Sequence, residues 1–248
     1  LLGALSATIF SASLYLSYFG IEIKLLNTIL AVFAFYTLLY FPKKSVVVAG
    51  LFIGLLWFYW IGFSFKYYNM GFMSPIISLS YGVLYALVFS TIAISNKIYI
   101  RAMVVFLLSY FAPFDWNWLQ MQLLFVHSYI GVFKYQFILV LLSLVLFNYL
   151  KNSYKYLAFL IIPLAFELTP YHQQKAPLKI KLIQTHVKQS EKWLPQNRVF
   201  LTMQNLKYIQ NAIKNKYDLV VLPESTFPYF MNHNPQVIKK LQELSKHI

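Results

Sequence analysis

Residues 45–65 of the chain are SVVVAGLFIGLLWFYWIGFSF, a stretch with no charged side chain between Lys44 and Lys66. About 20 apolar residues cross the hydrocarbon core of a membrane as a helix, because a helix satisfies its own backbone hydrogen bonds where water is absent. Three more uncharged, largely apolar stretches follow along the chain, at 67–96, 102–114 and 135–150. Several such stretches in series predict a multi-pass membrane protein.

The composition agrees with this interpretation. Of 248 residues, 59% are hydrophobic and only 11% are charged, and the mean hydropathy is +0.59. We expect a transmembrane helical domain at 1–170 with about seven spans. The spans are predicted near 1–19, 25–41, 46–65, 72–94, 98–114, 135–150 and 154–169. The apolar segment 116–133 is interrupted by amides and a histidine and begins Trp-Asn-Trp, so we expect it at a membrane–water interface.

Basic residues near the spans predict the orientation, because cytoplasmic loops retain Lys and Arg. Every second junction between spans is more basic than its neighbours, with six basic residues against three at the alternate junctions. The more basic set is Lys43, Lys44, Lys97, Arg101, Lys151 and Lys155. We therefore expect these in the cytoplasm and everything after about Thr169 outside the cytoplasmic membrane of a bacterium.

The net charge of +14 is concentrated in the last third of the chain, where twelve basic residues accompany four acidic ones after Thr169. A basic surface beside a membrane favours anionic lipid head groups over nucleic acid, for which no recognition motif is present. The chain has no cysteine, which excludes disulfides, thiolate metal sites and a cysteine nucleophile within these residues.

A second domain is predicted after a linker at 171–177, where the composition becomes polar. In this domain, 178–248, alternation at 179–185 predicts a strand, and apolar residues at helical spacing predict a helix over 199–216. A further strand is expected at 219–222 and a helix at 235–248, with Asn234 as its cap. Strand, helix, strand, helix is the beginning of an α/β domain, which about 70 residues cannot complete.

Residues 219–228, LVVLPESTFP, deliver one carboxylate, Glu224, into a turn. Four apolar residues predict a strand covered on both faces, and Pro223 cannot continue a central ladder. Strand ends are where α/β sheets place their chemistry. The alternative is that Glu224 simply begins a solvated loop, and the residues of this stretch alone do not decide between the two.

Several motifs together resemble the bacterial apolipoprotein N-acyltransferase family, which joins a membrane bundle to a carbon–nitrogen hydrolase (nitrilase-like) domain. They are Gln189-Ser-Glu-Lys-Trp193, the Pro-Glu-Ser of residues 223–225, Phe114 to Leu119, and the glycines and aromatics of the third span (Gly50, Gly54, Trp57, Phe58, Gly62 and Ser64). The resemblance implies a multi-pass α-helical bundle followed by the start of an α-β-β-α nitrilase-like sandwich.

The resemblance also implies a chemistry. A Cys thiolate takes an acyl chain from a membrane phospholipid as a thioester and passes it to the N-terminal amine of a diacylated lipoprotein, with a Glu as proton acceptor. Glu224 matches that Glu, and we expect its preceding apolar strand to bury it. Trp193 matches a family tryptophan that affects acyl transfer, and the alternative is an ordinary core aromatic. Lys192 is expected to be solvated.

In the family the Lys and Cys of the catalytic set follow the Glu, beyond residue 248, so we expect this chain to be an N-terminal fragment and inactive alone. No cofactor or metal site is predicted, because the five histidines lack metal-ligand spacing. We expect a monomer. The alternatives are a membrane transporter, which the nearly charge-free span centres disfavour, and a non-catalytic membrane scaffold.

Overall fold

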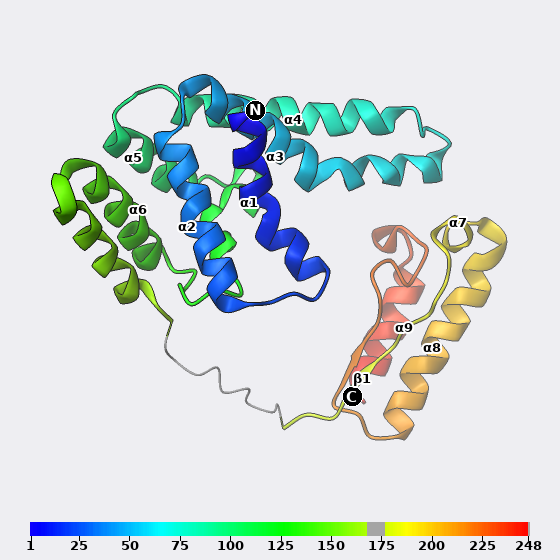
Figure 1. Ribbon diagram of the computed structural model, residues 1–248. Helices are drawn as coiled ribbons and strands as arrows, with labels where there is room; N and C mark the ends of the chain where they lie inside the picture. The colour runs from blue at the N-terminus through cyan, green and yellow to red at the C-terminus, as the bar shows by residue number, and fades with distance from the viewer. Residues whose placement is uncertain (168–176, 248) are drawn as a thin grey trace. The chain divides into compact units, whose positions relative to one another are not determined.

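The computed structural model describes residues 1–167 and 177–247 and is mainly helical (Figure 1). The chain divides into two compact units, Leu1–Pro170 and Tyr171–Ile248. The first unit contains the apolar stretches, and the second contains the two strands that the structure describes. Each unit is described by itself below.

The first unit is built from helices that follow the apolar stretches of the sequence. The α-helices are α1 (Leu2–Tyr18), α2 (Lys24–Tyr40), α3 (Lys43–Phe58), α4 (Met73–Ile92), α5 (Ile98–Leu108) and α6 (Lys134–Tyr149). The 3-10 helices are η1 (Tyr59–Tyr68), η2 (Pro113–Asp115), η3 (Asn117–Leu119), η4 (Met121–Phe125) and η5 (Asn152–Ala165). Helical structure is therefore found within each of the seven stretches where a span is expected.

Among the residues that the structure describes, two helices are long and apolar enough to cross a membrane: Lys43–Tyr68, which is α3 continued by η1, and Met73–Ile92, which is α4. The apolar helices α1, α2, α5 and α6 are shorter. The seventh expected span differs most, because its described part is the 3-10 helix η5 rather than an α-helix. Pro163 lies inside η5 and has no backbone N–H to donate to the preceding turn. Residues 168 and 169 of that span lie outside the described residues.

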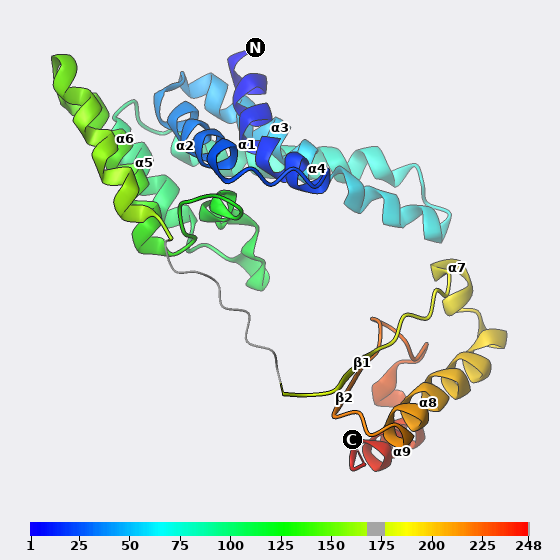
Figure 2. The same ribbon diagram turned by 60° about the horizontal axis from the view of Figure 1, so that its bottom comes forward.

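Helices α3 and α4 run antiparallel and side by side (Figures 1 and 2). Glycine permits this close approach. A Cβ added at Gly50 would lie 2.6 Å from the Tyr85 carbonyl oxygen, and one added at Gly62 would lie 2.6 Å from the Ser74 carbonyl oxygen. The glycines of residues 45–65 therefore serve helix packing, as small residues commonly do between membrane helices.

Aromatic side chains fill the centre of the first unit. Phe10, Phe35 and Phe89 are each at most 1% exposed, and the Phe10 ring meets the Phe35 ring edge-on at 5.7 Å. Phe125, from the segment expected at an interface, packs against Phe35 at 5.5 Å. The segment 116–133 thus sends part of its length into the core of the bundle instead of lying wholly on its surface.

The junctions between the helices form two sets, and hydrogen bonds connect junctions of the same set. In one set, Lys43 Nζ donates to the Ile94 carbonyl at 2.8 Å and Arg101 donates to the Phe41 carbonyl at 2.6 Å. In the other, Asn27 donates to the His127 carbonyl at 3.2 Å, which joins the start of α2 to the segment before α6. Alternate junctions lie together, as they must in a bundle whose helices run up and down.

The second unit is a β–α–β arrangement with an added helix. It contains β1 (Ile180–Leu182), α7 (Gln189–Lys192), η6 (Pro195–Asn197), α8 (Arg198–Lys214), β2 (Leu219–Val221), η7 (Met231–His233) and α9 (Pro235–Ser245). Strands β1 and β2 are parallel, with Ile180 paired to Leu219 (Figure 2). The expected elements are all present, although both strands are shorter than predicted.

Two details of the predicted second unit are wrong. Strand β2 was expected to be covered on both faces, but Leu219 and Val221 are each 42% exposed, because β1 and the helices cover only part of it. Asn234 precedes α9 as expected, yet its side chain makes no cap. Its amide instead donates to the Phe230 carbonyl at 3.0 Å, which holds the turn that leads into the helix.

Candidate functional site

The two parallel strands end at the same edge of the small sheet. Beyond β1, the N–H of Ile183 donates to the carbonyl of Val221 at 2.9 Å, so the pairing extends to the last residue of β2. Leu222 and Pro223 then lead directly to Glu224. The carboxylate is therefore delivered at a strand end, where the sequence predicts it.

Glu224 begins a tight turn. Ser225 adopts a left-handed conformation with φ of 53°, and the Thr226 hydroxyl donates back to the Pro223 carbonyl. The Glu224 side chain is exposed. Its expected burial is wrong for the described residues, because the turn projects from a strand that is itself covered on only part of its surface.

Two side chains from other elements bind the backbone of this turn. Asn205, which is 2% exposed on α8, donates from Nδ2 to the Thr226 carbonyl at 2.9 Å. Lys192, at the end of α7, donates from Nζ to the Glu224 carbonyl at 3.1 Å. The two accepting carbonyls flank Ser225, so the left-handed residue is held on both sides.

Lys192 is partly exposed, as expected for a solvated charge, and in addition it donates to the Glu224 carbonyl, a contact that the sequence does not predict. Lys192 belongs to the Gln-Ser-Glu-Lys-Trp motif that the sequence singles out, but the spacing of the motif does not show which of its residues contacts Glu224. Asn205 was not predicted at all. Its signal is an amide among the apolar positions on the inner face of α8, between Leu201 and Ile209.

Trp193 follows Lys192 and is 40% exposed. Within the described residues Trp193 is not covered as a core aromatic would be, and its role in acyl transfer stays a prediction. The adjacent Leu194 is 38% exposed, and the two side chains form an apolar surface next to the residue that holds the Glu224 turn.

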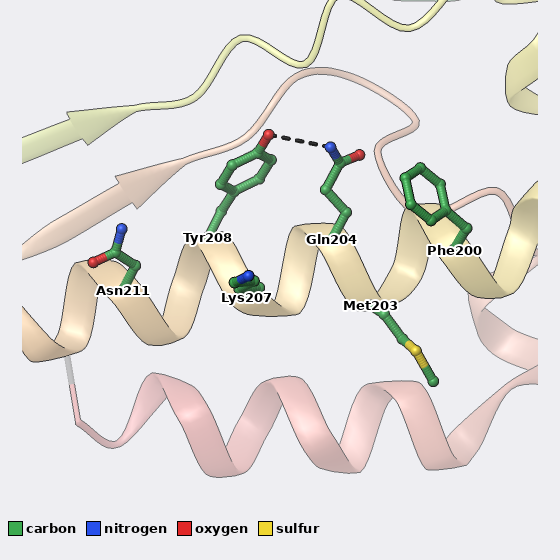
Figure 3. A pocket seen from close by; sticks show the side chains of 6 residues that line it. All are labelled: Phe200, Met203, Gln204, Lys207, Tyr208 and Asn211. Atoms are coloured by element: carbon green, nitrogen blue, oxygen red, sulfur yellow. Dashed lines mark hydrogen bonds between the residues drawn. The ribbon is translucent and has the colours of Figure 1, made fainter.

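A shallow hollow runs along α8 and is lined by Phe200, Met203, Gln204, Lys207, Tyr208 and Asn211 (Figure 3). Gln204 and Tyr208 point to the same side of the helix and are joined by a 3.3 Å hydrogen bond, whereas Met203 points to the other side (Figure 3). None of these residues belongs to the turn that contains Glu224. The hollow is therefore a feature of the helix surface and lies apart from the candidate chemistry.

The first unit has a cavity of about 490 Å³ between α1, the end of α3 and the 117–127 segment. Trp57, Phe58 and Trp118 supply much of its apolar wall, and His127 lies at its polar edge. His127 Nδ1 is 3.5 Å from a Glu22 carboxylate oxygen, so the two groups form an ion pair when the imidazole is protonated. Among residues 1–167 and 177–247, no group of three His, Asp or Glu side chains could hold a metal ion.

A bundle of apolar helices joined to a β–α–β unit, with a carboxylate held at the strand end, defines an integral membrane protein with an α/β segment of its own. The model of the apolipoprotein N-acyltransferase integral membrane domain matches residues 1–168. The chain belongs to the apolipoprotein N-acyltransferase family, a family of acyltransferase enzymes.

Individual relatives extend the similarity beyond the membrane domain. An apolipoprotein N-acyltransferase of Wolinella succinogenes is 33% identical over 98% of this chain and 59% of its own length. One from Helicobacter hepaticus is 35% identical over 82% of this chain and 52% of its own length. One from Campylobacter jejuni is 29% identical over 96% of this chain and 55% of its own length. The chain thus spans a little over half the length of the curated relatives it matches.

Proposed function

We propose that this chain supplies the membrane bundle and the base-bearing part of an enzyme that acylates lipoproteins. The acyl donor is a membrane phospholipid, and the acceptor is the N-terminal amine of a diacylated lipoprotein. The observation that carries the proposal is Glu224 at the carboxyl edge of a parallel strand pair, on a chain whose first 168 residues match the family's membrane domain. No cofactor enters the reaction.

In the proposed chemistry Glu224 accepts the proton of a Cys thiol as the thiolate attacks the ester carbonyl of the phospholipid. The acyl–oxygen bond breaks, the lysophospholipid oxygen takes the proton, and a thioester remains on sulfur. The lipoprotein amine then attacks the thioester and the carbon–sulfur bond breaks; Glu224 takes the proton that the amine loses and returns it to the sulfur, which restores the thiol. The 248 residues contain no cysteine, so sulfur must come from outside them, and we expect no thioester on this chain alone.

An exposed Glu224 is compatible with this role if the substrates or further protein cover it during the reaction. Exclusion of water would strengthen its interaction with the thiol proton, which exposure to solvent weakens. Trp193, exposed beside the turn, is proposed to contact the acyl chain of the lipid. The remaining length of the relatives is compatible with additional parts of a nitrilase-like α-β-β-α domain around this strand pair.

We further propose a location in the bacterial cytoplasmic membrane with the second unit on the outer face, and a monomeric state. The charge asymmetry between the two sets of junctions supports this orientation. The seven-span topology rests on the seven apolar stretches, each of which contains helical structure, and two of which are long enough to span unaided.

The test is an acyl-transfer assay on the complete gene product in detergent. A phosphatidylethanolamine with a labelled acyl chain is the donor, a synthetic diacylated lipopeptide is the acceptor, and mass spectrometry detects the N-acylated product. Glu224→Gln should lower kcat by about 10²–10⁴-fold, the usual contribution of a general base. The matched control is Glu243→Gln on the exposed side of α9, where the Glu243 carboxylate pairs with Lys240 at 3.4 Å. Full activity in Glu224→Gln would contradict the proposal.

A further inference from the structure

The buried amide of Asn205 is unusual on the inner face of α8. Its neighbours on that face are Leu201, Ile209 and Ala212, which anchor the helix by burial. A polar group in such a position is retained when it forms a hydrogen bond, and Nδ2 of Asn205 forms one with the Thr226 carbonyl at 2.9 Å. Its Oδ1 is also buried and has no partner among the described residues. Among the described residues, the side chain of Asn205 therefore forms its polar interaction with the turn, through Nδ2.

Lys192 reaches the same turn from a different helix, α7. Its Nζ lies 3.1 Å from the Glu224 carbonyl oxygen, whereas Lys188, on the preceding turn of chain, is 79% exposed and lies 4.0 Å from Glu191. The Lys192 side chain is partly exposed and the hydrogen bond itself lies in contact with solvent, so its contribution rests on the charge of the donor and not on burial. A charged donor gives a stronger hydrogen bond to a carbonyl than a neutral one does.

The turn needs such support because Ser225 has φ of 53°. A left-handed conformation is unfavourable for a residue with a Cβ and persists when surrounding contacts determine it. The Thr226 hydroxyl supplies one contact from within the turn, to Pro223. Asn205 and Lys192 supply the contacts from outside: Asn205 to the carbonyl of Thr226, the residue after Ser225, and Lys192 to the carbonyl of Glu224, the residue before it.

We infer that Asn205 and Lys192 are positioning residues for Glu224: Lys192 holds the peptide group between Glu224 and Ser225, Asn205 holds the peptide group that follows Thr226, and together they set the direction in which the carboxylate leaves the strand end. The inference rests on the proposed role of Glu224 as proton acceptor. Proton transfer requires the carboxylate within hydrogen-bond reach of the thiol, and misplacement by about 1 Å can lower a rate by about 10²-fold.

The experiment uses the complete gene product, two test variants, their two matched controls, and the comparison variants Lys192→Arg and Glu224→Gln. Asn205→Asp keeps the shape of the side chain but replaces the donor by an acceptor, and Lys192→Met keeps the stem but removes the donor. The matched controls make the same changes at exposed positions, Asn211→Asp on α8 and Lys188→Met. For each variant, kcat and KM of lipopeptide acylation are measured together with hydrogen–deuterium exchange of the peptide that covers 222–230.

Both test variants should exchange faster at 222–230 and lose about 10–100-fold in kcat, with KM for the lipopeptide little changed. Lys192→Arg, which keeps a charged donor, should recover most of the loss, and neither control should differ from the wild type. An unchanged kcat in Lys192→Met, while Glu224→Gln is inactive, would overturn the positioning role and leave the proposed function intact.

Two further outcomes remain distinct. Faster exchange with full activity would show that the turn is held by these residues without consequence for the chemistry, which also overturns the inference. Full activity of Glu224→Gln would instead remove the proposed function on which the inference rests. If Asn205→Asp fails to fold, the Lys192→Met and Lys192→Arg pair decides, since Lys192 lies outside the inner face of α8.

Discussion

Replacement of Arg101 by Met should destabilise the first unit more than any other single change at a basic residue there. Arg101 is 3% exposed, and its guanidinium joins three parts of the chain. Nη1 donates to the carbonyls of Phe41 at 2.6 Å and Leu39 at 3.1 Å, at the end of α2, and Nε donates to the Ser95 carbonyl at 2.8 Å, before α5. Met keeps most of the apolar stem but none of these donors.

The magnitude follows from the two donor nitrogens. A hydrogen bond from a charged group contributes about 1.5–3 kcal/mol, and the loss of the three bonds to Phe41, Leu39 and Ser95 is partly offset because the desolvation cost of the buried charge disappears. We expect a net loss of about 3 kcal/mol in the free energy of unfolding, which corresponds to about 6–12 °C in melting temperature for a unit of this size.

The assay is thermal unfolding of the purified protein in detergent, followed by tryptophan fluorescence. Arg101→Lys is the matched control, because an ammonium group keeps the charge but cannot reach both Phe41 and Ser95 with the fork of a guanidinium. Its melting temperature should lie between those of Arg101→Met and the wild type. A wild-type melting temperature for Arg101→Met would refute the argument that this arginine fastens α2 to α5.

Two other predictions concern packing and the candidate site. Gly50→Ala should lower the free energy of unfolding by about 1–3 kcal/mol, because the new Cβ would lie 2.6 Å from the Tyr85 carbonyl oxygen. The control is Gly71→Ala, whose new Cβ would lie 3.7 Å from the Lys66 Cγ and which should melt like the wild type. If both melt alike, the close approach of α3 and α4 does not require glycine. Trp193→Ala should leave the melting temperature nearly unchanged, since the side chain is 40% exposed, but should lower acyl transfer; equal loss of both would indicate a structural role instead.

The sequence predicts the helices well because their signals are local. Each signal depends on residues within one segment: absence of charge over 45–65 and 135–150, and apolar residues at helical spacing over 199–216. The structure has helices in all three segments. Burial of Glu224 could not be predicted from its own segment, because it depends on what covers β2. The Lys192 contact with the Glu224 carbonyl likewise joins residues 32 apart in sequence, at a distance that only the folded strand pair determines.

The basic residues that predict orientation do not all stand at the surface of the first unit. Arg101 is buried among carbonyls at the end of α2, and Lys134 donates to the Ser109 carbonyl after α5. Each has a structural reason to be basic, because a cation stabilises the exposed carbonyls at a helix C-terminus. One belongs to each set of junctions, so both can be left out without reversing the asymmetry between the sets. Lys43 also donates to a carbonyl at the end of a helix, that of Ile94 after α4. The orientation proposed for the second unit therefore depends on the remaining lysines, Lys44, Lys97, Lys151 and Lys155 against Lys24 and Lys66, and the asymmetry persists when the three charges that bind carbonyls of the bundle are left out.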